Sequence, residues 1–240
     1  MIFAVNTSTK HFSVALMYED GTIQAEYSIS PGSKNFTGFM PAIHSLFTSS
    51  HIDVRDVKAL IVAMGPGSFT GLRIGLSMAK GMAQGLQIGI IGVSSLEAMA
   101  SQLPYISAPI CAMIDSRKGE VFTALFRWGK DYEIVRIRED TCLKITDIPS
   151  IIDGTTLFLG NDFKNHGHLI KKELGPQALL APSHLWSLKA SSVGSLGLKR
   201  FLANDFDDIQ DLTPRYLRPP AIRSNPHPLL SAEKEHQVLG

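Results

Sequence analysis

The sequence predicts a mixed α/β protein made of two similar halves, and three observations indicate this. Short apolar runs typical of strands alternate with longer segments of helical periodicity throughout the 240 residues. Residues 5–8 and 12–16 (VNTS and FSVAL) align without a gap with residues 114–117 and 121–125 (IDSR and VFTAL). A proline-bounded stretch, residues 104–109, separates the two patterns. We interpret the chain as a duplicated βββαβαβ unit, with a further helix closing each lobe.

The first lobe is expected to span residues 1–104. The turn residues Glu19, Asp20 and Gly21 join two alternating segments, which predicts a hairpin. Apolar runs predict two later buried strands, and apolar residues spaced four apart predict the helices. Strands are expected at residues 2–6, 11–18, 22–29, 59–64 and 88–93, and helices at residues 35–47, 71–86 and 95–103.

The second lobe is expected to span residues 105–218 and repeats the pattern. A proline-rich tail, residues 219–240, follows it and is expected to be mobile. Strands are expected at residues 110–115, 120–128, 132–138, 156–160 and 178–181, and helices at residues 144–152, 166–174 and 186–203.

A glycine-rich loop between the strand at 59–64 and the helix from Gly71 is the most informative stretch of the sequence. Strand, loop and helix N-terminus in this order form a candidate anion cradle, because loop N–H groups and the helix dipole point the same way. The loop is not a Walker A motif, since Gly71 is followed by Leu72 and Arg73 instead of Lys-Ser/Thr. Arg73 could still reach an anion or a carboxylate on another subunit.

The helix after this loop is apolar around most of its circumference, more than an ordinary surface helix needs. Its small residues form two rows, Gly71/Gly75/Ala79 and Ser77/Gly81/Gly85. Each interior glycine costs about 1 kcal/mol of helix propensity relative to alanine, so we expect other backbones to approach closely. One face is expected to meet the chain's own sheet. The other face meets either a further element of the chain or a second protein.

The composition excludes several classes of protein. A net charge of +1 gives no overall positive charge of the kind that favours nucleic-acid binding. Two cysteines in apolar surroundings, Cys111 and Cys142, indicate buried thiols in a reducing compartment. No signal peptide or membrane-length apolar run occurs, and we expect a cytoplasmic protein.

Two short polar motifs follow the first strand of each lobe. In sugar kinases and actins the first turn carries an aspartate before hydroxyl residues, but here it reads Asn6-Thr7-Ser8. Asparagine cannot act as a base, so an Asx turn is the favoured interpretation. Asp115, Arg117 and Glu120 in the second lobe are interpreted as a structural ion-pair group, with catalysis as the lesser alternative.

Histidines indicate no metal site. His166 and His168 are two residues apart and do not share a helical face, and no H-E-x-x-H pair occurs. His44, inside a predicted helix, is expected to pack or to lie in an interface. No Ser-His-Asp or Cys-His set can be assembled from the spacing.

These residues together resemble the TsaB family of accessory subunits in bacterial tRNA threonylcarbamoyladenosine biosynthesis. The resemblance covers residues 1–218. It is carried by the Asn6-Thr7-Ser8 strand end and by three further motifs: GPGSFTGLRIG at residues 65–75, D-x-R-x-x-EVF at residues 115–122 and P-x-YLR at residues 214–218. Family members usually begin with Asp-Thr-Ser, so Asn6 is a departure.

The resemblance implies an ASKHA (actin-like) fold and no catalysis by the chain alone. It implies pairing with a catalytic TsaD-type subunit, an associated TsaE-type ATPase, and contact with tRNA only through the complex. No cofactor or metal of its own is expected, with ATP and Mg²⁺ acting only in the complex. A homodimer through the same helices is expected when the partner is missing.

The expected sites are a cleft and a surface. The candidate vestigial nucleotide or phosphate cleft comprises Asn6, Thr7, Ser8, Gly65, Gly67, Ser68 and Thr70. The expected partner interface comprises Phe39, Ile43, Phe47, Gly71, Arg73, Gly75, Met78, Ala79 and Met82. The main alternative is an active small-molecule kinase or ATPase of the same fold; a metallopeptidase and a purely structural interaction module are weaker alternatives.

Overall fold

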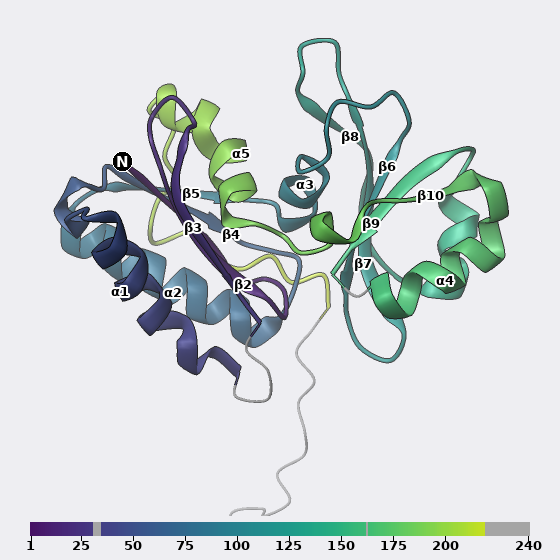
Figure 1. Ribbon diagram of the computed structural model, residues 1–240, viewed down its shortest axis with the longest axis horizontal. Helices are drawn as coiled ribbons and strands as arrows, with labels where there is room; N and C mark the ends of the chain where they lie inside the picture. Colours follow the sequence, from purple (N-terminus) through teal and green to yellow (C-terminus); the bar gives the residue numbers. More distant parts are fainter. Residues whose placement is uncertain (31–34, 162, 219–240) are drawn as a thin grey trace, which may run out of the picture.

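The computed structural model describes residues 1–30, 35–161 and 163–218 and contains two five-stranded sheets in separate lobes (Figure 1). The expected mobile tail at residues 219–240 lies outside the described residues. The ASKHA arrangement of two duplicated α/β lobes is confirmed, because each sheet consists of an antiparallel three-stranded meander extended by two parallel strands.

The sheet of the first lobe has the order β3-β2-β1-β4-β5. Strand β1 pairs antiparallel with β2 and parallel with β4, so it lies at the centre of the sheet. Its sequence is apolar without alternation because both faces of the sheet are covered. The strands are β1 (Ile2–Asn6), β2 (Phe12–Met17), β3 (Ile23–Ile29), β4 (Ala59–Ala63) and β5 (Gly89–Val93).

Helices α1 (Phe39–Ser50) and α2 (Phe69–Leu86) cover one face of this sheet. Their apolar residues form one buried cluster with the side chains of Phe3, Val14 and Leu60. The opposite face carries Ile2, Ala15, Ile61 and their neighbours, which belong to a different cluster. Alternate residues of each strand therefore supply two separate cores.

The sheet of the second lobe has the order β10-β9-β6-β7-β8 and repeats this topology. The strands are β6 (Ile110–Asp115), β7 (Glu120–Trp128), β8 (Ile134–Lys144), β9 (Thr156–Gly160) and β10 (Ala178–Leu180). Its helix α4 (Phe163–Leu174) begins before the expected residue 166, and β8 continues well past the expected residue 138. The 3₁₀ segments are Asn35–Gly38, Val54–Asp56, Ile145–Ile151, Gly175–Gln177 and Ser183–Leu185.

The last helix, α5 (Ala190–Leu202), crosses to the first lobe, which corrects the expected division of the chain. We expected it to belong to residues 105–218, but it packs on β1, β2, β4 and β5 (Figure 1). Gly194 and Gly197 permit this contact, because a Cβ atom there would lie 2.3 Å from Met17 Sδ and 2.6 Å from Ile61 Cγ2. Conversely α3 (Ser95–Ala100), expected in the first lobe, packs mainly on the second sheet.

The chain then returns between the lobes as a segment that we call the strap, residues 204–218 (Figure 1). The N–H of Asp207 donates to Ile90 O at 2.9 Å, and the N–H of Arg215 donates to Met64 O at 2.7 Å. The strap is therefore attached to β5 and to the residue that follows β4.

Candidate functional site

Asn6, at the end of β1, is enclosed by the protein. Its Oδ1 atom accepts hydrogen bonds from the backbone N–H of Ser8 at 3.0 Å and from Ser8 Oγ at 2.7 Å, which is the predicted Asx turn. Its Nδ2 atom donates to Leu188 O at 3.0 Å, just before α5. The side chain is fully buried, and both of its polar atoms are used within the chain.

The glycine-rich loop packs directly against this turn. A Cβ atom on Gly67 would lie 2.1 Å from Ser8 O, and the N–H of Ser68 donates to the same oxygen at 2.7 Å. The N–H groups of Gly65 and Gly71 donate to Ser95 Oγ and to Ser68 Oγ. Glycine is needed here for close approach to protein backbone, and the predicted anion cradle is partly occupied by the chain itself.

The inner row of small residues on α2 faces its own sheet. A Cβ atom on Gly71 would lie 2.0 Å from Thr7 O, and one on Gly75 would lie 2.0 Å from Thr7 Oγ1. Ala79 is fully buried in the same row. The small residues of this row are therefore explained by contacts within the first lobe.

The outer row of α2 is open. Ser77, Gly81 and Gly85 are exposed, and a Cβ atom on either glycine would meet no atom of the described residues within 4 Å. Met78 and Met82 lie beside this row and are partly buried. The outward side of the helix therefore carries these small residues and the two methionines together with the exposed Arg73 and Gln84.

The burial of the expected interface residues corrects their assignment. The side chains of Phe39, Ile43 and Phe47 lie in the first-lobe core, and Gly71, Gly75 and Ala79 are buried against or near β1. A charged side chain at Gly75 would therefore collide with Thr7 and could not test an interface alone. Arg73, Met78 and Met82 keep at least part of their surface exposed.

A cleft of about 450 Å³ lies between the two lobes. Of the expected cleft residues, Ser8, Gly67, Ser68 and Thr70 line it, whereas Asn6, Thr7 and Gly65 are not part of its lining. Sequence reasoning missed most of the charged lining. The missed charged residues are Lys10, Lys118, Arg215 and Arg218.

The predicted ion pairs within the Asp115, Arg117 and Glu120 group do not form among the described residues. Asp115 faces Lys10 of the opposite lobe at 3.4 Å and His166 Nε2 at 3.8 Å. Glu120 accepts from Arg218 of the strap. Arg117 is exposed and pairs with no carboxylate among the described residues. The sequence spacing suggested a local ion-pair group, whereas the partners come from distant segments.

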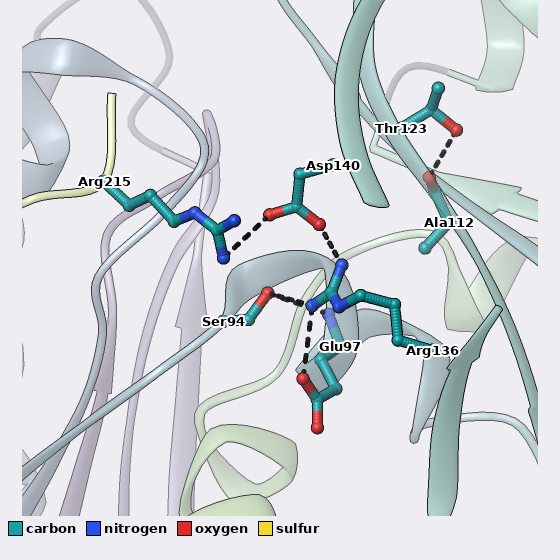
Figure 2. Close-up of polar contacts among 7 residues, drawn as sticks. All are labelled: Ser94, Glu97, Ala112, Thr123, Arg136, Asp140 and Arg215. Atoms are coloured by element: carbon teal, nitrogen blue, oxygen red, sulfur yellow. Dashed lines mark hydrogen bonds and ion pairs between the residues drawn. The ribbon is translucent and has the colours of Figure 1, made fainter. Parts of the chain in front are cut away.

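A second polar group joins the lobes beside the cleft, as Figure 2 shows. Arg136 of β8 donates to Asp140 Oδ1, and its Nη2 atom lies 3.2 Å from Glu97 Oε2 and 3.3 Å from Ser94 Oγ. Arg215 of the strap lies 3.4 Å from Asp140 Oδ2. The Asp140 side chain has no exposed surface, so its charge depends on these two arginines.

Three further features of the described residues concern a thiol, metal binding and membrane crossing. Burial raises the pKa of the Cys111 thiol to about 12, so this thiol stays protonated near neutral pH. No group of three His, Cys, Asp or Glu side chains in the described ranges is placed to hold a metal ion. No described helix is both long and apolar enough to cross a bilayer.

Comparison with known proteins identifies the family. A family model described as "TsaD: tRNA N6-adenosine threonylcarbamoyltransferase" matches residues 36–150. The tRNA threonylcarbamoyladenosine biosynthesis protein TsaB of Bacillus subtilis (strain 168) is 33% identical over 220 residues, covering 90% of this chain and 93% of that protein. The chain belongs to the TsaB family.

Solved structures agree with the fold. A Pseudomonas aeruginosa protein described as similar to peptidase YEAZ superposes with a TM-score of 0.74 at 23% identity, covering 90% of this chain and 99% of that one. A Clostridium difficile activator of 2-hydroxyisocaproyl-CoA dehydratase, solved with bound ADPNP, gives a TM-score of 0.52 at 10% identity, covering 85% of this chain and 97% of that one. The second likeness places this TsaB family member in the ASKHA fold and carries nothing about its ligands.

Proposed function

We propose that this chain is a non-catalytic subunit of tRNA threonylcarbamoyladenosine biosynthesis that pairs with a TsaD-type catalytic subunit. The name of the B. subtilis relative supports the pathway, since it is called a biosynthesis protein for this modification. The observation that carries the pairing is the open outward face of α2. That face has small residues where propensity alone would favour larger ones.

The proposed partner surface combines the outer sides of α1 and α2. Met40 on α1 is 59% exposed. On α2 the surface comprises Arg73, Gly81 and Gly85, which are exposed, with the partly exposed Met78 and Met82. Exposed glycines on a helix allow another backbone to approach closely, and methionine side chains adapt to a partner's shape.

Two residues in and beside the cleft support the absence of catalysis by this chain alone. Asn6 has no ionisable group, and both of its polar atoms are occupied within the chain. The carboxylate of Asp115 faces Lys10 and His166. A general base would have to be free to accept a proton from a substrate, and neither residue is placed to do so.

The match to a TsaD family model supports pairing between this chain and a subunit of similar fold. The matched residues, 36–150, include α1 and α2. Subunits of similar fold can pair through equivalent surfaces about a pseudo-twofold axis, and two copies of this chain could do the same when the partner is missing. The proposal includes a TsaE-type ATPase as a further component, and tRNA contact through the complex.

Gly81→Arg tests the pairing. The substitution should leave the monomer folded, because a Cβ atom at this position would meet nothing within 4 Å. It should place a large cation in the proposed contact and abolish co-elution with the TsaD-type subunit of the same organism in size-exclusion chromatography.

Gly154→Arg is the matched control, because Gly154 lies in the second lobe and its Cβ atom would also meet nothing within 4 Å. This variant should co-elute like the unmodified chain. Unchanged co-elution of Gly81→Arg, with circular dichroism confirming the fold of both variants, would place the contact elsewhere.

A further inference from the structure

Five cationic side chains from three separate segments line the interlobe cleft. Lys10 comes from the turn between β1 and β2, Arg117 and Lys118 from the turn between β6 and β7, and Arg215 and Arg218 from the strap. Asp115 is the one carboxylate among the described residues that line the cleft. In a chain of net charge +1, this is a local concentration of positive charge.

Pairing inside the chain balances three of these cations. Lys10 lies 3.4 Å from Asp115, Arg215 lies 3.4 Å from Asp140, and Arg218 contacts Glu120. Arg117 and Lys118 are exposed, and neither has a carboxylate partner in the described part of the chain. The cleft therefore carries two uncompensated positive charges on one turn.

We propose that this cleft binds a polyphosphate group without a metal ion. Arg117 and Lys118 would neutralise phosphate oxygens, and the polar residues Ser8, Ser68 and Thr70 line the same space. Its volume of about 450 Å³ is in the range of small-ligand sites. The inference goes beyond the proposed pairing function and is independent of it.

The absence of a free carboxylate argues against a magnesium-bound ligand. Mg²⁺ in phosphate sites is held by one or two carboxylates together with the phosphates. Asp115 faces Lys10 and His166, and Asn6 takes the place where relatives of this fold carry an aspartate. The arginine and lysine side chains would supply the positive charge that a metal supplies elsewhere.

Isothermal titration calorimetry of the full chain with inorganic triphosphate in EDTA-containing buffer tests the inference. We expect saturable binding that weakens with added salt. Excess Mg²⁺ should weaken it further, because magnesium neutralises the triphosphate before it reaches the cleft. Absence of binding, or binding only when Mg²⁺ is present, would overturn the inference.

The double variant Arg117→Gln/Lys118→Asn assigns the binding to this turn. Lys118 has a φ of 57°, a conformation that asparagine tolerates, so the turn should be retained. The affinity should fall by about tenfold or more, as expected when two charge-assisted contacts are removed. The matched control is Arg127→Gln/Lys130→Gln at the other end of β7, which removes the same charge from positions outside the cleft lining.

The control variant should keep the unmodified affinity within about twofold. An equal loss in both double variants would show binding to net charge alone and would overturn the site. ATP and adenosine distinguish the ligand sources: a higher affinity for ATP than for triphosphate supports a nucleotide, and equal affinity supports an inorganic chain. Adenosine binding as tightly as ATP would contradict a phosphate site.

Discussion

The glycines of α2 have two different physical roles. Gly75 is required by its own lobe, because its Cβ atom would lie 2.0 Å from Thr7 Oγ1 and 3.1 Å from Thr7 Cβ. Gly81, in the same helix, faces open space. Only the second kind of glycine is left without a packing role in the described part of the chain, and the proposed partner surface includes it.

Alanine substitution should separate these roles. Gly75→Ala should lower the free energy of unfolding by about 1–3 kcal/mol through overpacking against Thr7. Gly81→Ala should raise it by about 0.5–1 kcal/mol, because alanine has the higher helix propensity and meets no neighbour. Urea unfolding monitored by circular dichroism measures both, and a stabilising Gly75→Ala would contradict the close contact with Thr7.

At Asn6 a side-chain amide makes contacts that a carboxylate could not make. Its amide can donate to Leu188 O while its Oδ1 atom accepts from Ser8, and an ionised carboxylate could not donate. The asparagine therefore stabilises the junction between β1 and the segment before α5.

At the scale of elements, α5 and the strap form one unit on the first lobe. Arg200 at the end of α5 makes hydrogen bonds to Asp207 at 2.9 and 3.1 Å and to Asp205 at 2.7 Å. Asp207 Oδ2 also accepts from the N–H of Gly92 in β5 at 2.7 Å. The hydrogen bonds to Asp207 and Asp205 raise the pKa of the Arg200 guanidinium above its ordinary value.

Asp207→Ala should therefore loosen the strap. The variant leaves Arg200 and the Gly92 N–H without this acceptor, and we expect a loss of about 1–3 kcal/mol in the free energy of unfolding. Asp205→Ala, which removes an exposed partner of the same arginine, is the control and should have the smaller effect. Hydrogen exchange should show faster exchange at Gly92 in Asp207→Ala alone, and equal exchange in the two variants would contradict this role.

The strap also connects the cleft to α2. The Tyr216 ring lies 4.8 Å from the Phe69 ring between centroids, and Arg73 Nε donates to Tyr216 Oη at 3.3 Å. Arg73, which belongs to the proposed partner surface, therefore contacts a residue of the cleft lining.

At the scale of the molecule, Arg215 of the strap, which is attached to the first lobe, reaches Asp140 of β8 in the second lobe beside the cleft. Arg136 contacts Asp140 within its own strand and reaches Glu97 and Ser94 at the start of α3 (Figure 2). Its guanidinium carbon lies 4.7 Å from the centre of the Phe126 ring. Because the Asp140 side chain has no exposed surface, its charge is compensated by Arg136 together with Arg215.

Arg136→Leu should destabilise the whole molecule. Leucine can still cover Phe126, but Asp140 and Glu97 lose their shared partner, and we expect a loss of about 3 kcal/mol or more in the free energy of unfolding. Arg138→Leu, at an exposed position of the same strand, is the control and should change stability little. Thermal unfolding compares the two variants, and equal melting temperatures would contradict the role of Arg136.

Sequence reasoning predicted the order of nearly all strands and helices, because hydrophobic periodicity depends on local burial. It predicted the Asx turn at Asn6 for the same reason, since that turn is built from neighbouring residues. It assigned Phe39, Ile43 and Gly75 to a partner surface, and the structure places them inside. Apolar periodicity marks which residues are covered but not what covers them.

The sequence by itself determined the two duplicated lobes, the family and the small-residue character of α2. Only the tertiary structure decided that α5 crosses to the first lobe, that α2 turns Gly81 and Gly85 outward, and that Arg215 and Arg218 reach the cleft. The physical reason is the sequence separation between the interacting residues. Periodicity and turns depend on residues close in the chain, whereas the cleft joins residues far apart in the sequence, such as Lys10 and Asp115.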